Sequence, residues 1–534
     1  MYDLMPDETL SPCLKGVAAS RSFSLPCFSC KITKFFAIPR HILDYFMFFK
    51  YQLALRLSGS PSDKFSKKLL CMVSLAMDVL KHLPFVPNEQ QALLVAAMCS
   101  FVGNGADRDV FVLNGYAGTG KTSVVGALIK TLAEHRKPVV LLAPTGRAAK
   151  VASALAGFPA STIHRKIFRP LSSDPSGASW YLAKNEHADT LFIIDEASLI
   201  SDSQGGGESL LRQVVRYIYS ARGCRMMLVG DEAQLPPVGQ TESTAMNPAR
   251  LRRLGLNPIC GTLDIPARQA ADSGIVHNAT IVRQLLFNSV PGLPAALDVT
   301  GFPEIAAISS VELAEVLADS YAAVGEEDTI IVTRSNRRAS NFNRAIRRMV
   351  MYAEDPIQRG DRLIVARNDY YWMKANKAAK HSPLIANGDT ALVTWVGRSQ
   401  KVYGRYFTEV ELQLSGGMVV SAQVMLRSLV CEGPSIPREE MERFYNHVMA
   451  SAEGSMSEKM AVALDDPYYN ALQVKYAYCV TCHKAQGGQW RHVYIDMGGI
   501  APENFTGDFY RWLYTALTRA TEKVFLINPT IPLR

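Results

Sequence analysis

The chain has 534 residues, which is too long for a single ordinary hydrophobic core. Its length therefore predicts several domains, about three. Hydrophobic residues make up 48% and charged residues 20% of the chain, which favours a soluble globular enzyme over a disordered or membrane-spanning chain. A formal net charge of +8 is a mild bias toward polyanionic partners and decides little alone. The function therefore has to be argued from motifs.

The first 71 residues differ in composition from the rest of the chain. Residues 31–57 are apolar but repeatedly interrupted by charged side chains, so we expect no membrane span there, and the start lacks the order of regions that a secretory signal requires. We expect residues 1–71 to be poorly ordered, or to come from an upstream-extended reading of the start site. Clear periodicity begins near Met72.

Ten cysteines are scattered without even spacing, which predicts a reducing compartment, with the cytoplasm as the expected location. Two Cys-x-x-Cys pairs occur, Cys27/Cys30 and Cys479/Cys482, and they would form a zinc site only if both pairs met in space. The second pair lies in an apolar run, residues 476–482, that predicts a buried strand. In such a strand cysteine is simply a small hydrophobic residue.

Short apolar runs alternate with longer helical patterns from residue 109 onward, which is typical of parallel α/β sheets. The strands expected in a first series are residues 110–113, 139–143, 191–194 and 226–229, and in a second series 329–333, 362–366, 492–496 and 524–527. The helices expected around them include residues 91–101, 122–134, 340–351 and 509–521. Two nucleotide-binding-type domains follow, one over residues 72–260 and one over residues 261–395 and 475–534.

An insertion over residues 396–474 interrupts the second domain. Residues 392–396, 409–414 and 418–424 alternate polar and apolar side chains around glycines, which predicts a small antiparallel barrel. Residues 433–470 are more polar, and we expect a flexible helical excursion there.

Residues 115–122, Gly-Tyr-Ala-Gly-Thr-Gly-Lys-Thr, match the pattern G-x-x-x-x-G-K-[ST] between a predicted strand and a predicted helix. Glycines let backbone N–H groups turn toward phosphates, while Lys121 reaches the β- and γ-phosphates and the Thr122 hydroxyl ligates Mg²⁺. ATP and Mg²⁺ are the cofactors that this loop predicts.

Phosphoryl transfer also needs an acid to hold the metal and a group to orient water. Asp195 and Glu196 end an apolar strand, and we expect Asp195 to hold Mg²⁺ and Glu196 to orient or deprotonate the attacking water. Gln234 precedes Pro236 and Pro237 at the end of the next strand, where an uncharged side chain can sense the γ-phosphate. A plain surface turn is the alternative for Gln234.

The phosphate loop, together with residues 142–150, 194–197 and 230–238, resembles superfamily 1 helicases, specifically the RecD/Dda-like group of superfamily 1B. Residues 268–275, 481–487 and 514–520 resemble motifs IV, V and VI in the family order. This resemblance, over residues 72–534, implies an α/β fold of two RecA-like P-loop NTPase domains with a small SH3-like β-barrel inserted in the second. It also implies ATP in the cleft between them, single-stranded DNA across their top and 5′ to 3′ movement.

The resemblance carries roles onto individual positions of this sequence. It implies nucleotide binding by Gln90, Gly115, Tyr116, Ala117, Gly118, Thr119, Gly120, Lys121, Thr122 and Ser123. It implies catalysis by Lys121, Thr122, Asp195, Glu196, Gln234, Arg268 and Arg519, with Thr122 and Asp195 on the metal. It implies DNA contacts by Thr145, Arg147, His164, Thr481 and His483.

For several of these positions the sequence is also consistent with a purely structural role. Gln90 is equally consistent with a polar residue at a helix start. Arg268 and Arg519 are expected to stabilise the γ-phosphate, but each can instead form an ordinary salt bridge, and His164 can be a helix-cap or core histidine.

Two surface features are open in the same way. Arg337, Arg344 and Arg348 share one helix face with Asn343 beside them, and they are either a solvated basic face or the border of a DNA track. Trp180 and Tyr181 lie where related helicases carry a strand-separating pin, although aromatic residues in a surface loop are equally consistent.

The sequence therefore predicts an ATP-dependent 5′ to 3′ DNA helicase or translocase that acts on single-stranded DNA and duplex junctions in repair, recombination or replication. We expect a monomer without membrane contact, and partner proteins from recombination or replication. One alternative is an RNA helicase or translocase, since phosphate contacts do not choose the sugar. Another is an ATP-gated subunit of a recombination complex, against which Glu196, Gln234 and Arg519 argue.

Overall fold

The computed structural model describes residues 64–170, 180–201, 208–267, 272–288, 292, 295–376, 385–415 and 417–534. Most of the predicted N-terminal extension and Cys27/Cys30 lie outside the described residues. The first described helix, α3 (Lys64–Lys81), begins ahead of the predicted domain limit at Met72. It packs on α4 (Glu89–Asn104) and α5 (Lys121–Glu134), so the folded part of the chain starts earlier than predicted.

The first domain is built on a six-stranded parallel sheet with strand order β3-β2-β6-β7-β1-β8. The strands are β1 (Asp109–Gly115), β2 (Val139–Ala143), β3 (Ala160–Thr162), β6 (Leu191–Ile194), β7 (Arg225–Gly230) and β8 (Asn257–Leu263). The first-series strands are confirmed as β1, β2, β6 and β7. Because β8 pairs with β1 as far as Leu263, this domain extends past the predicted limit at residue 260.

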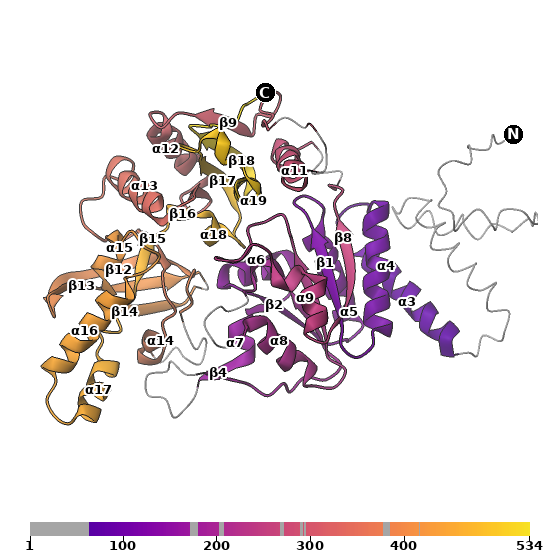
Figure 1. Cartoon of the computed structure of the whole chain (residues 1–534), viewed down its shortest axis with the longest axis horizontal. Helices are drawn as coiled ribbons and strands as arrows, with labels where there is room; N and C mark the ends of the chain where they lie inside the picture. The colour runs from indigo at the N-terminus through magenta and orange to yellow at the C-terminus, as the bar shows by residue number, and fades with distance from the viewer. Residues whose placement is uncertain are drawn as a thin grey trace, which may run out of the picture. The chain divides into compact units, whose positions relative to one another are not determined.

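Helices surround this sheet in the alternating order that the sequence predicts (Figure 1). Besides α3, α4 and α5 they are α6 (Gly146–Ala156), α7 (Ile163–Ile167), α8 (Leu210–Tyr219) and α9 (Pro248–Arg253), with the short 3₁₀ turns η2 (Ala197–Leu199) and η3 (Thr244–Met246). A hairpin of β4 (Phe168–Pro170) and β5 (Trp180–Leu182) lies beside α7.

The second domain has its own parallel sheet, with order β16-β10-β17-β18-β9. Its strands are β9 (Ile305–Ile308), β10 (Thr329–Thr333), β16 (Cys479–Thr481), β17 (Trp490–Asp496) and β18 (Ala520–Ile527). Its helices are α11 (Gly274–Phe287), α12 (Leu313–Val324), α13 (Asn336–Met349), α18 (Cys482–Ala485) and α19 (Gly507–Leu517), with η5 (Pro502–Asn504). Residues 329–333, 492–496 and 524–527 are confirmed as parallel strands.

The prediction that residues 362–366 belong to this parallel sheet is wrong. They form β11 (Arg362–Val365), which pairs antiparallel with β12 (Thr390–Val402) and β15 (Val474–Tyr476). An apolar run that is buried on both sides does not reveal the direction of its neighbours. The insertion therefore runs from β11 to β15 and is wider than the predicted residues 396–474.

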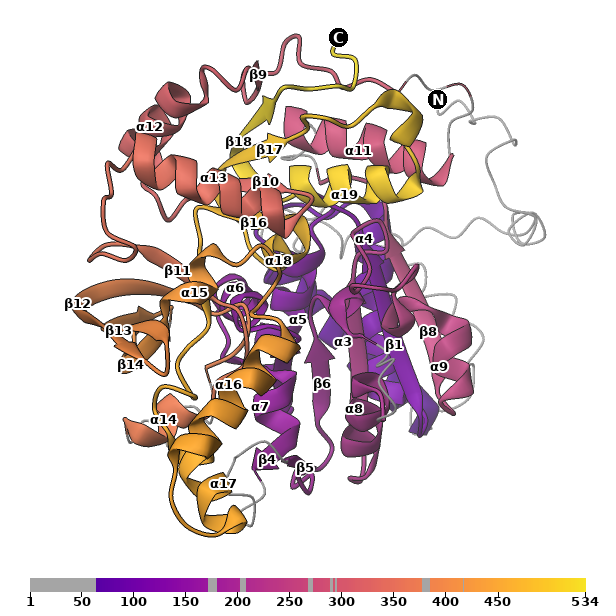
Figure 2. The same cartoon turned by 60° about the vertical axis from the view of Figure 1, so that its left-hand side comes forward.

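The inserted sheet is antiparallel, as predicted, with order β14-β13-β12-β11-β15 (Figure 2). It includes β13 (Arg405–Leu414) and β14 (Val419–Met425), and its helices are α14 (Tyr371–Ala375), α15 (Leu426–Val430), α16 (Arg438–Ser451) and α17 (Met456–Asp465). A bridge joins Val424 of β14 to Leu472, just before β15, so the two edges of the sheet approach each other. Helices α16 and α17 confirm the helical excursion and pack around the buried ring of Phe444.

The predicted single strand over residues 476–482 is divided between two sheets. Strand β15 ends at Tyr476 in the inserted sheet, and β16 begins at Cys479 in the parallel sheet. Both Cys479 and Cys482 are buried and free, and no cluster of metal-ligating side chains occurs among the described residues. Within the same residues, no helix is long and apolar enough to cross a membrane.

A buried ion pair ties α13 to the base of the insertion. The Arg347 guanidinium donates to both carboxylate oxygens of Asp361, each at 2.9 Å, and its Nη1 donates to the Tyr476 hydroxyl at 3.2 Å. Tyr478 donates a further bond to Asp361 at 3.0 Å. On the same helix Asn343 is buried and bonds the backbone of Cys479, so its predicted place beside the exposed arginines is wrong.

Removing one partner of this pair leaves a charge buried without compensation. Arg347→Ala is expected to destabilise the fold by about 3–5 kcal/mol. Thermal unfolding measures this, with Arg348→Ala as the control because Arg348 is exposed one position along. Equal melting temperatures for the two variants would contradict the prediction.

Candidate active site

The predicted nucleotide-binding residues come from the carboxyl ends of three adjacent strands. The phosphate loop follows β1, Asp195 and Glu196 follow β6, and Gln234 follows β7, and these strands are neighbours in the order β6-β7-β1. Ligands bind at this edge of open parallel sheets. The fold therefore brings these residues together, as the sequence predicts.

The phosphate loop has the backbone that a phosphate cradle requires. Gly118 and Gly120 have φ of 72° and 80°, in the left-handed region that favours glycine. A Cβ at Gly115 would lie 2.9 Å from Lys121 Cδ, so only glycine fits against the lysine stem. Lys121 Nζ donates to the carbonyls of Gly115 at 2.9 Å and Gly230 at 3.2 Å, which fixes the ammonium at the centre of the loop. Thr122 and Ser123 follow Lys121 in the first turn of α5.

Asp195 and Glu196 have the surroundings expected at a cation site. Burial, and then the charge of Glu196, raise the pKa of Asp195 to about 6, and Lys121 offsets part of this shift. Glu196 has φ of 51°, and its Oε2 is buried without a hydrogen-bond partner among the described residues. The desolvated Asp195 carboxylate lies close enough to Lys121 to feel its charge, and carboxylate and hydroxyl oxygens are the hard donors that Mg²⁺ prefers, so Asp195 and Thr122 fit the predicted metal by their chemistry.

The segment after β7, residues 231–235, adds further polar groups to the site. Asp231 is fully buried, and its pKa is raised by burial and lowered in part by Lys121. Gln234 is 5% exposed, and its Oε1 has no partner in the described part of the chain. An unpartnered buried amide oxygen is costly, which marks Gln234 as a side chain placed to meet a ligand or water.

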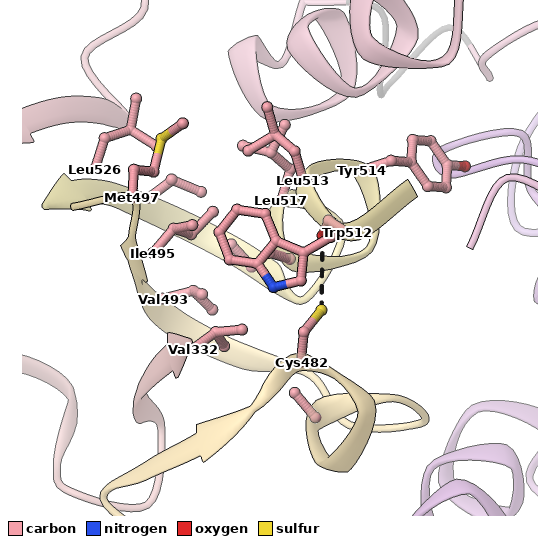
Figure 3. Close-up of a cluster of buried hydrophobic side chains, with 14 of the residues drawn as sticks. Val332, Cys482, Val493, Ile495, Met497, Trp512, Leu513, Tyr514, Leu517 and Leu526 are labelled. Atoms are coloured by element: carbon pink, nitrogen blue, oxygen red, sulfur yellow. Dashed lines mark hydrogen bonds between the residues drawn. The ribbon is translucent and has the colours of Figure 1, made fainter. Parts of the chain in front are cut away.

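The second domain holds this segment directly. Ala233 and Leu235 belong to its hydrophobic core. Figure 3 shows part of this core, with Trp512 and other residues of α19. The Leu235 backbone N–H donates to Thr515 Oγ1 at 2.8 Å, and the Leu235 carbonyl accepts from Gln486 Nε2 at 2.7 Å. The segment beside the nucleotide candidates is thus also part of the neighbouring domain.

Tyr514 makes the most direct connection between the domains. It lies on α19, and its hydroxyl accepts from the Ala117 N–H of the phosphate loop at 2.8 Å and donates to Asp231 Oδ2 at 2.7 Å. Figure 3 shows its ring directed away from the Trp512 cluster toward the first domain. Tyr514 begins the segment 514–520 that resembles motif VI, but the sequence predicts no role for it, because nothing local in the sequence reveals a partner almost 400 residues away.

The two predicted arginines have different outcomes. Arg268 lies outside the described residues. Arg519 is buried, and its guanidinium donates within its own domain, to the carbonyls of Thr515 at 3.0 Å and Gly488 at 3.3 Å. It forms no ion pair within the described residues, so it is not the ordinary salt bridge considered from the sequence, and the structure does not bring it to the phosphate loop.

The glutamines at positions 90 and 91 differ in what they contact. Gln90 exchanges hydrogen bonds with Asp264, donating to its Oδ1 at 2.7 Å and accepting from its N–H at 3.0 Å. Gln91 is buried, forms a capping box with Asn88, and donates to the Thr119 carbonyl of the phosphate loop at 2.8 Å. Gln91 was missed, although the spacing Asn-x-x-Gln is a capping-box signal readable from sequence.

Tyr116 gives the site another connection that the sequence does not show. Its hydroxyl donates to Glu232 at 2.8 Å, and the Arg283 guanidinium of α11 lies over its ring at 4.3 Å. Arg283 also donates to the Asp264 carbonyl at 3.1 Å. The second domain therefore places a positive charge beside the mouth of the phosphate loop.

The predicted DNA contacts lie at the ends of β2 and β3 in the first domain and of β16 in the second. His164 and His483 are exposed there, whereas Thr481 is buried and the Thr145 hydroxyl caps α6 by accepting from Ala148 N–H at 3.2 Å. Thr145 and His164 follow β2 and β3 of the first domain's sheet, in which β2 is next to β6, whereas Thr481 and His483 lie at the end of β16 in the second domain's sheet, so each sheet carries part of the set.

Arg147 lies at a junction of three parts of the chain. Its guanidinium stacks on Trp490 of the second domain at 4.6 Å, and burial lowers its pKa to about 10 although Asp389 of the insertion opposes the shift. A Cβ on Gly488 would lie 2.7 Å from Arg147 Cδ. Arg147 Nη1 has no hydrogen-bond partner among the described residues, so it retains a donor for a ligand.

Trp180 and Tyr181 lie on the hairpin strand β5. Tyr181 is half exposed, whereas Trp180 contacts Tyr370 of the insertion with ring centroids 5.0 Å apart. The loop between the hairpin strands lies outside the described residues. The structure thus places one of the two aromatic residues in an internal contact instead of at a tip.

Comparisons with known proteins agree with this geometry. A family model described as an AAA domain matches residues 87–270, and a model of the UvrD-like helicase C-terminal domain matches residues 476–527. The two models thus match the phosphate-loop side and the α19 side of the site.

Individual relatives differ in how much of their length is matched. An uncharacterized protein of Acanthamoeba polyphaga mimivirus is 20% identical over 83% of this chain and all of its own length. The ATP-dependent RecD2 DNA helicase of Deinococcus radiodurans is 30% identical over 36% of this chain, which is 24% of that relative. The crystal structure of Pif1 helicase from Bacteroides with ADP-AlF3 and single-stranded DNA is 15% identical over 84% of this chain and 93% of its own, with a TM-score of 0.44.

Glu196 is expected to act on water and not on nucleotide binding. Glu196→Gln keeps the shape of the side chain but replaces an acceptor oxygen with an amide that cannot take a proton, so kcat for ATP should fall by about 10²- to 10⁴-fold while nucleotide affinity is kept. Steady-state ATPase and calorimetric ADP binding measure the two effects. A loss of affinity equal to the loss of turnover would contradict the assigned role.

The two glutamines can be separated by base specificity. If Gln90 reads adenine, Gln90→Ala raises KM for ATP but not for GTP, while Gln91→Ala raises KM for both and lowers the melting temperature, because it removes a buried hydrogen bond worth about 1 kcal/mol. ATPase and GTPase assays of both variants make the comparison. Equal effects of Gln90→Ala on KM for both nucleotides would show that Gln90 does not read adenine and serves only to bond Asp264.

Proposed function

We infer, from the premise that this chain is a superfamily 1B helicase of the RecD-like group, that it uses ATP hydrolysis to move 5′ to 3′ along single-stranded DNA and to separate duplex ahead of it. The observation that carries the inference is the attachment of residues 231–235 to the second domain. A change at the phosphate loop cannot occur without effect on the neighbouring domain, and such coupling is what a motor requires.

Mg²⁺, held by Thr122 and Asp195, would neutralise developing charge on the transferring phosphoryl group. Lys121 holds the β- and γ-phosphates, since its ammonium is already fixed by two carbonyls at the loop. Glu196, with a free buried oxygen, orients and deprotonates water, and Gln234 reports the γ-phosphate. The last two roles use side-chain oxygens that are buried without a hydrogen-bond partner among the described residues.

Arg519 and Arg268 are assigned to the closed form of the cleft. Arg519 donates to carbonyls of its own domain, so reaching a γ-phosphate requires the guanidinium to exchange those bonds for a charged acceptor. Bonds to charged acceptors are the stronger ones, which favours the exchange once the domains close.

The DNA track follows the strand ends β3, β2 and β16, with contacts from Thr145, Arg147, His164, Thr481 and His483. Arg147 supports this assignment because its Nη1 has no partner among the described residues, whereas Thr145 and Thr481 offer backbone groups more readily than hydroxyls. Phosphate contacts carry no base information, so low sequence specificity follows. RNA remains the second candidate, because no described group is dedicated to the sugar.

Three broader assignments complete the proposal. The insertion is an SH3-like barrel, supported by hydrogen bonds from Leu472 N–H to the Gln423 carbonyl and from Met425 N–H to the Leu472 carbonyl, which join the sheet edges. The free cysteines of the described residues support a cytoplasmic location. Repair, recombination or replication is the setting, with a monomer that meets partner proteins at duplex junctions.

Single-stranded DNA is expected to stimulate ATPase strongly, and single-stranded RNA much less. The protein should also unwind a duplex with a 5′ tail in preference to one with a 3′ tail. Lys121→Ala should abolish both the ATPase activity and the unwinding. Absence of stimulation by either polymer would overturn the motor assignment, while stronger stimulation by RNA would promote the RNA helicase.

The exposed arginines of α13 provide a test of the DNA track. If Arg344 and Arg348 border it, replacing both with glutamate lowers the slope of log affinity against log salt by about 0.7 for each lost single-strand phosphate contact. Arg216→Glu on α8 is the control, since Arg216 is exposed and pairs with Glu208. A slope equal to that of the unmodified protein would show a merely solvated face.

A further inference from the structure

The Tyr514 hydroxyl occupies a position between two groups that the proposed mechanism uses. It is fully buried, and it bonds the Ala117 N–H on one side and the Asp231 carboxylate on the other. Both partners belong to the first domain, while the tyrosine belongs to α19 of the second. The hydroxyl oxygen of this second-domain residue is therefore hydrogen-bonded both to the phosphate loop and to the segment after β7.

The surrounding contacts make this arrangement more than a packing contact. Adjacent Thr515 accepts from the Leu235 N–H, and Arg511, one turn earlier, donates to the Glu232 carbonyl. Helix α19 thus bonds residues 231–235 at three successive points along one face. The bond to Ala117 is different, because the N–H groups of a phosphate loop are the groups that receive phosphate oxygens.

We propose that Tyr514 is a positioning residue that competes with nucleotide phosphate for the Ala117 amide and so transmits occupancy of the phosphate loop to α19. A phosphate oxygen that takes this amide displaces the hydroxyl. The hydroxyl then keeps only Asp231, and the helix that carries it keeps only its bonds to residues 231–235. This inference rests on the proposed motor function and assigns the first step of its coupling.

The charge balance at the site favours such an exchange. A phosphate oxygen is anionic and a stronger acceptor than a neutral hydroxyl, so the loop gains by the replacement. Asp231 keeps its donor from Tyr514 and a second one from the Ala233 N–H at 3.0 Å. The Asp231 carboxylate is therefore not left unpaired when the phosphate enters.

Tyr514→Phe tests the proposal because it keeps the ring and removes the competing oxygen. Measured by calorimetry without any polymer, the variant should bind ATPγS about two- to tenfold more tightly than the unmodified protein, the range expected for one ordinary hydrogen bond. Its DNA stimulation of ATPase should fall, since occupancy no longer displaces a bond to α19.

Tyr510→Phe is the matched control, because Tyr510 lies on the same helix and its hydroxyl makes no hydrogen bond within the described residues. Its affinity for ATPγS should not change. If Tyr514→Phe does not fold, a fluorinated tyrosine at position 514 keeps the volume and weakens the oxygen as an acceptor, and it should tighten binding in the same direction.

A purely structural role for Tyr514 predicts a lower melting temperature with unchanged or weaker ATPγS binding, and that result overturns the proposal. The affinity is measured without DNA, so it is independent of the motor assignment. Tighter binding by the variant together with no DNA stimulation of the unmodified protein would support the competition and reject the motor. Unchanged ATPγS binding by Tyr514→Phe, together with strong DNA stimulation of the unmodified protein, would reject the competition and support the motor.

Discussion

The attachment of residues 231–235 to the second domain is the interaction on which the rest of the site depends. Ala233 and Leu235 are core residues of the second domain, although the strand they follow, β7, belongs to the first. Backbone groups in such a place must be bonded, and Thr515 and Gln486 bond both polar groups of Leu235. The first domain supplies the chemistry at this edge, and the second domain holds that edge in position.

Burial and charge are linked at the same place. Asp195 and Asp231 are desolvated carboxylates, and Lys121 is the positive group that lowers the pKa of each. Uncompensated burial of carboxylates is costly, so the site is consistent only if cations complete it. Glu196 Oε2 and Gln234 Oε1, which have no partner in the described part of the chain, also require hydrogen bonds.

Much of this could be predicted from the sequence, and the reasons for success and failure are physical. Strands β6 and β10 match their predicted residues because uninterrupted apolar runs bounded by turn residues are strong local signals. The phosphate loop is equally local. Residues 362–366 failed because their burial fits either kind of sheet, and the identity of the partner strand is not a local property.

The functional residues that were not predicted from the sequence have one property in common. Tyr514, Arg283 and Arg347 act through partners that are distant in sequence or belong to another element, so no spacing or periodicity marks them. Gln91 is the exception, since its capping box was readable. Predicted roles for Arg519 and the DNA contacts depend on a bound partner, and a fold alone does not assign them.

The paired strands β11 and β15 have a consequence for how this chain can vary. They lie side by side in register, with Leu363 opposite Tyr476 and Val365 opposite Val474, so the insertion leaves and returns at one point. The entropy of closing a loop grows only with the logarithm of its length, by about 0.6 kcal/mol per doubling. The insertion can therefore be lengthened, shortened or exchanged at small cost to the parallel sheet, which makes this the natural place for the chain to acquire new specificity.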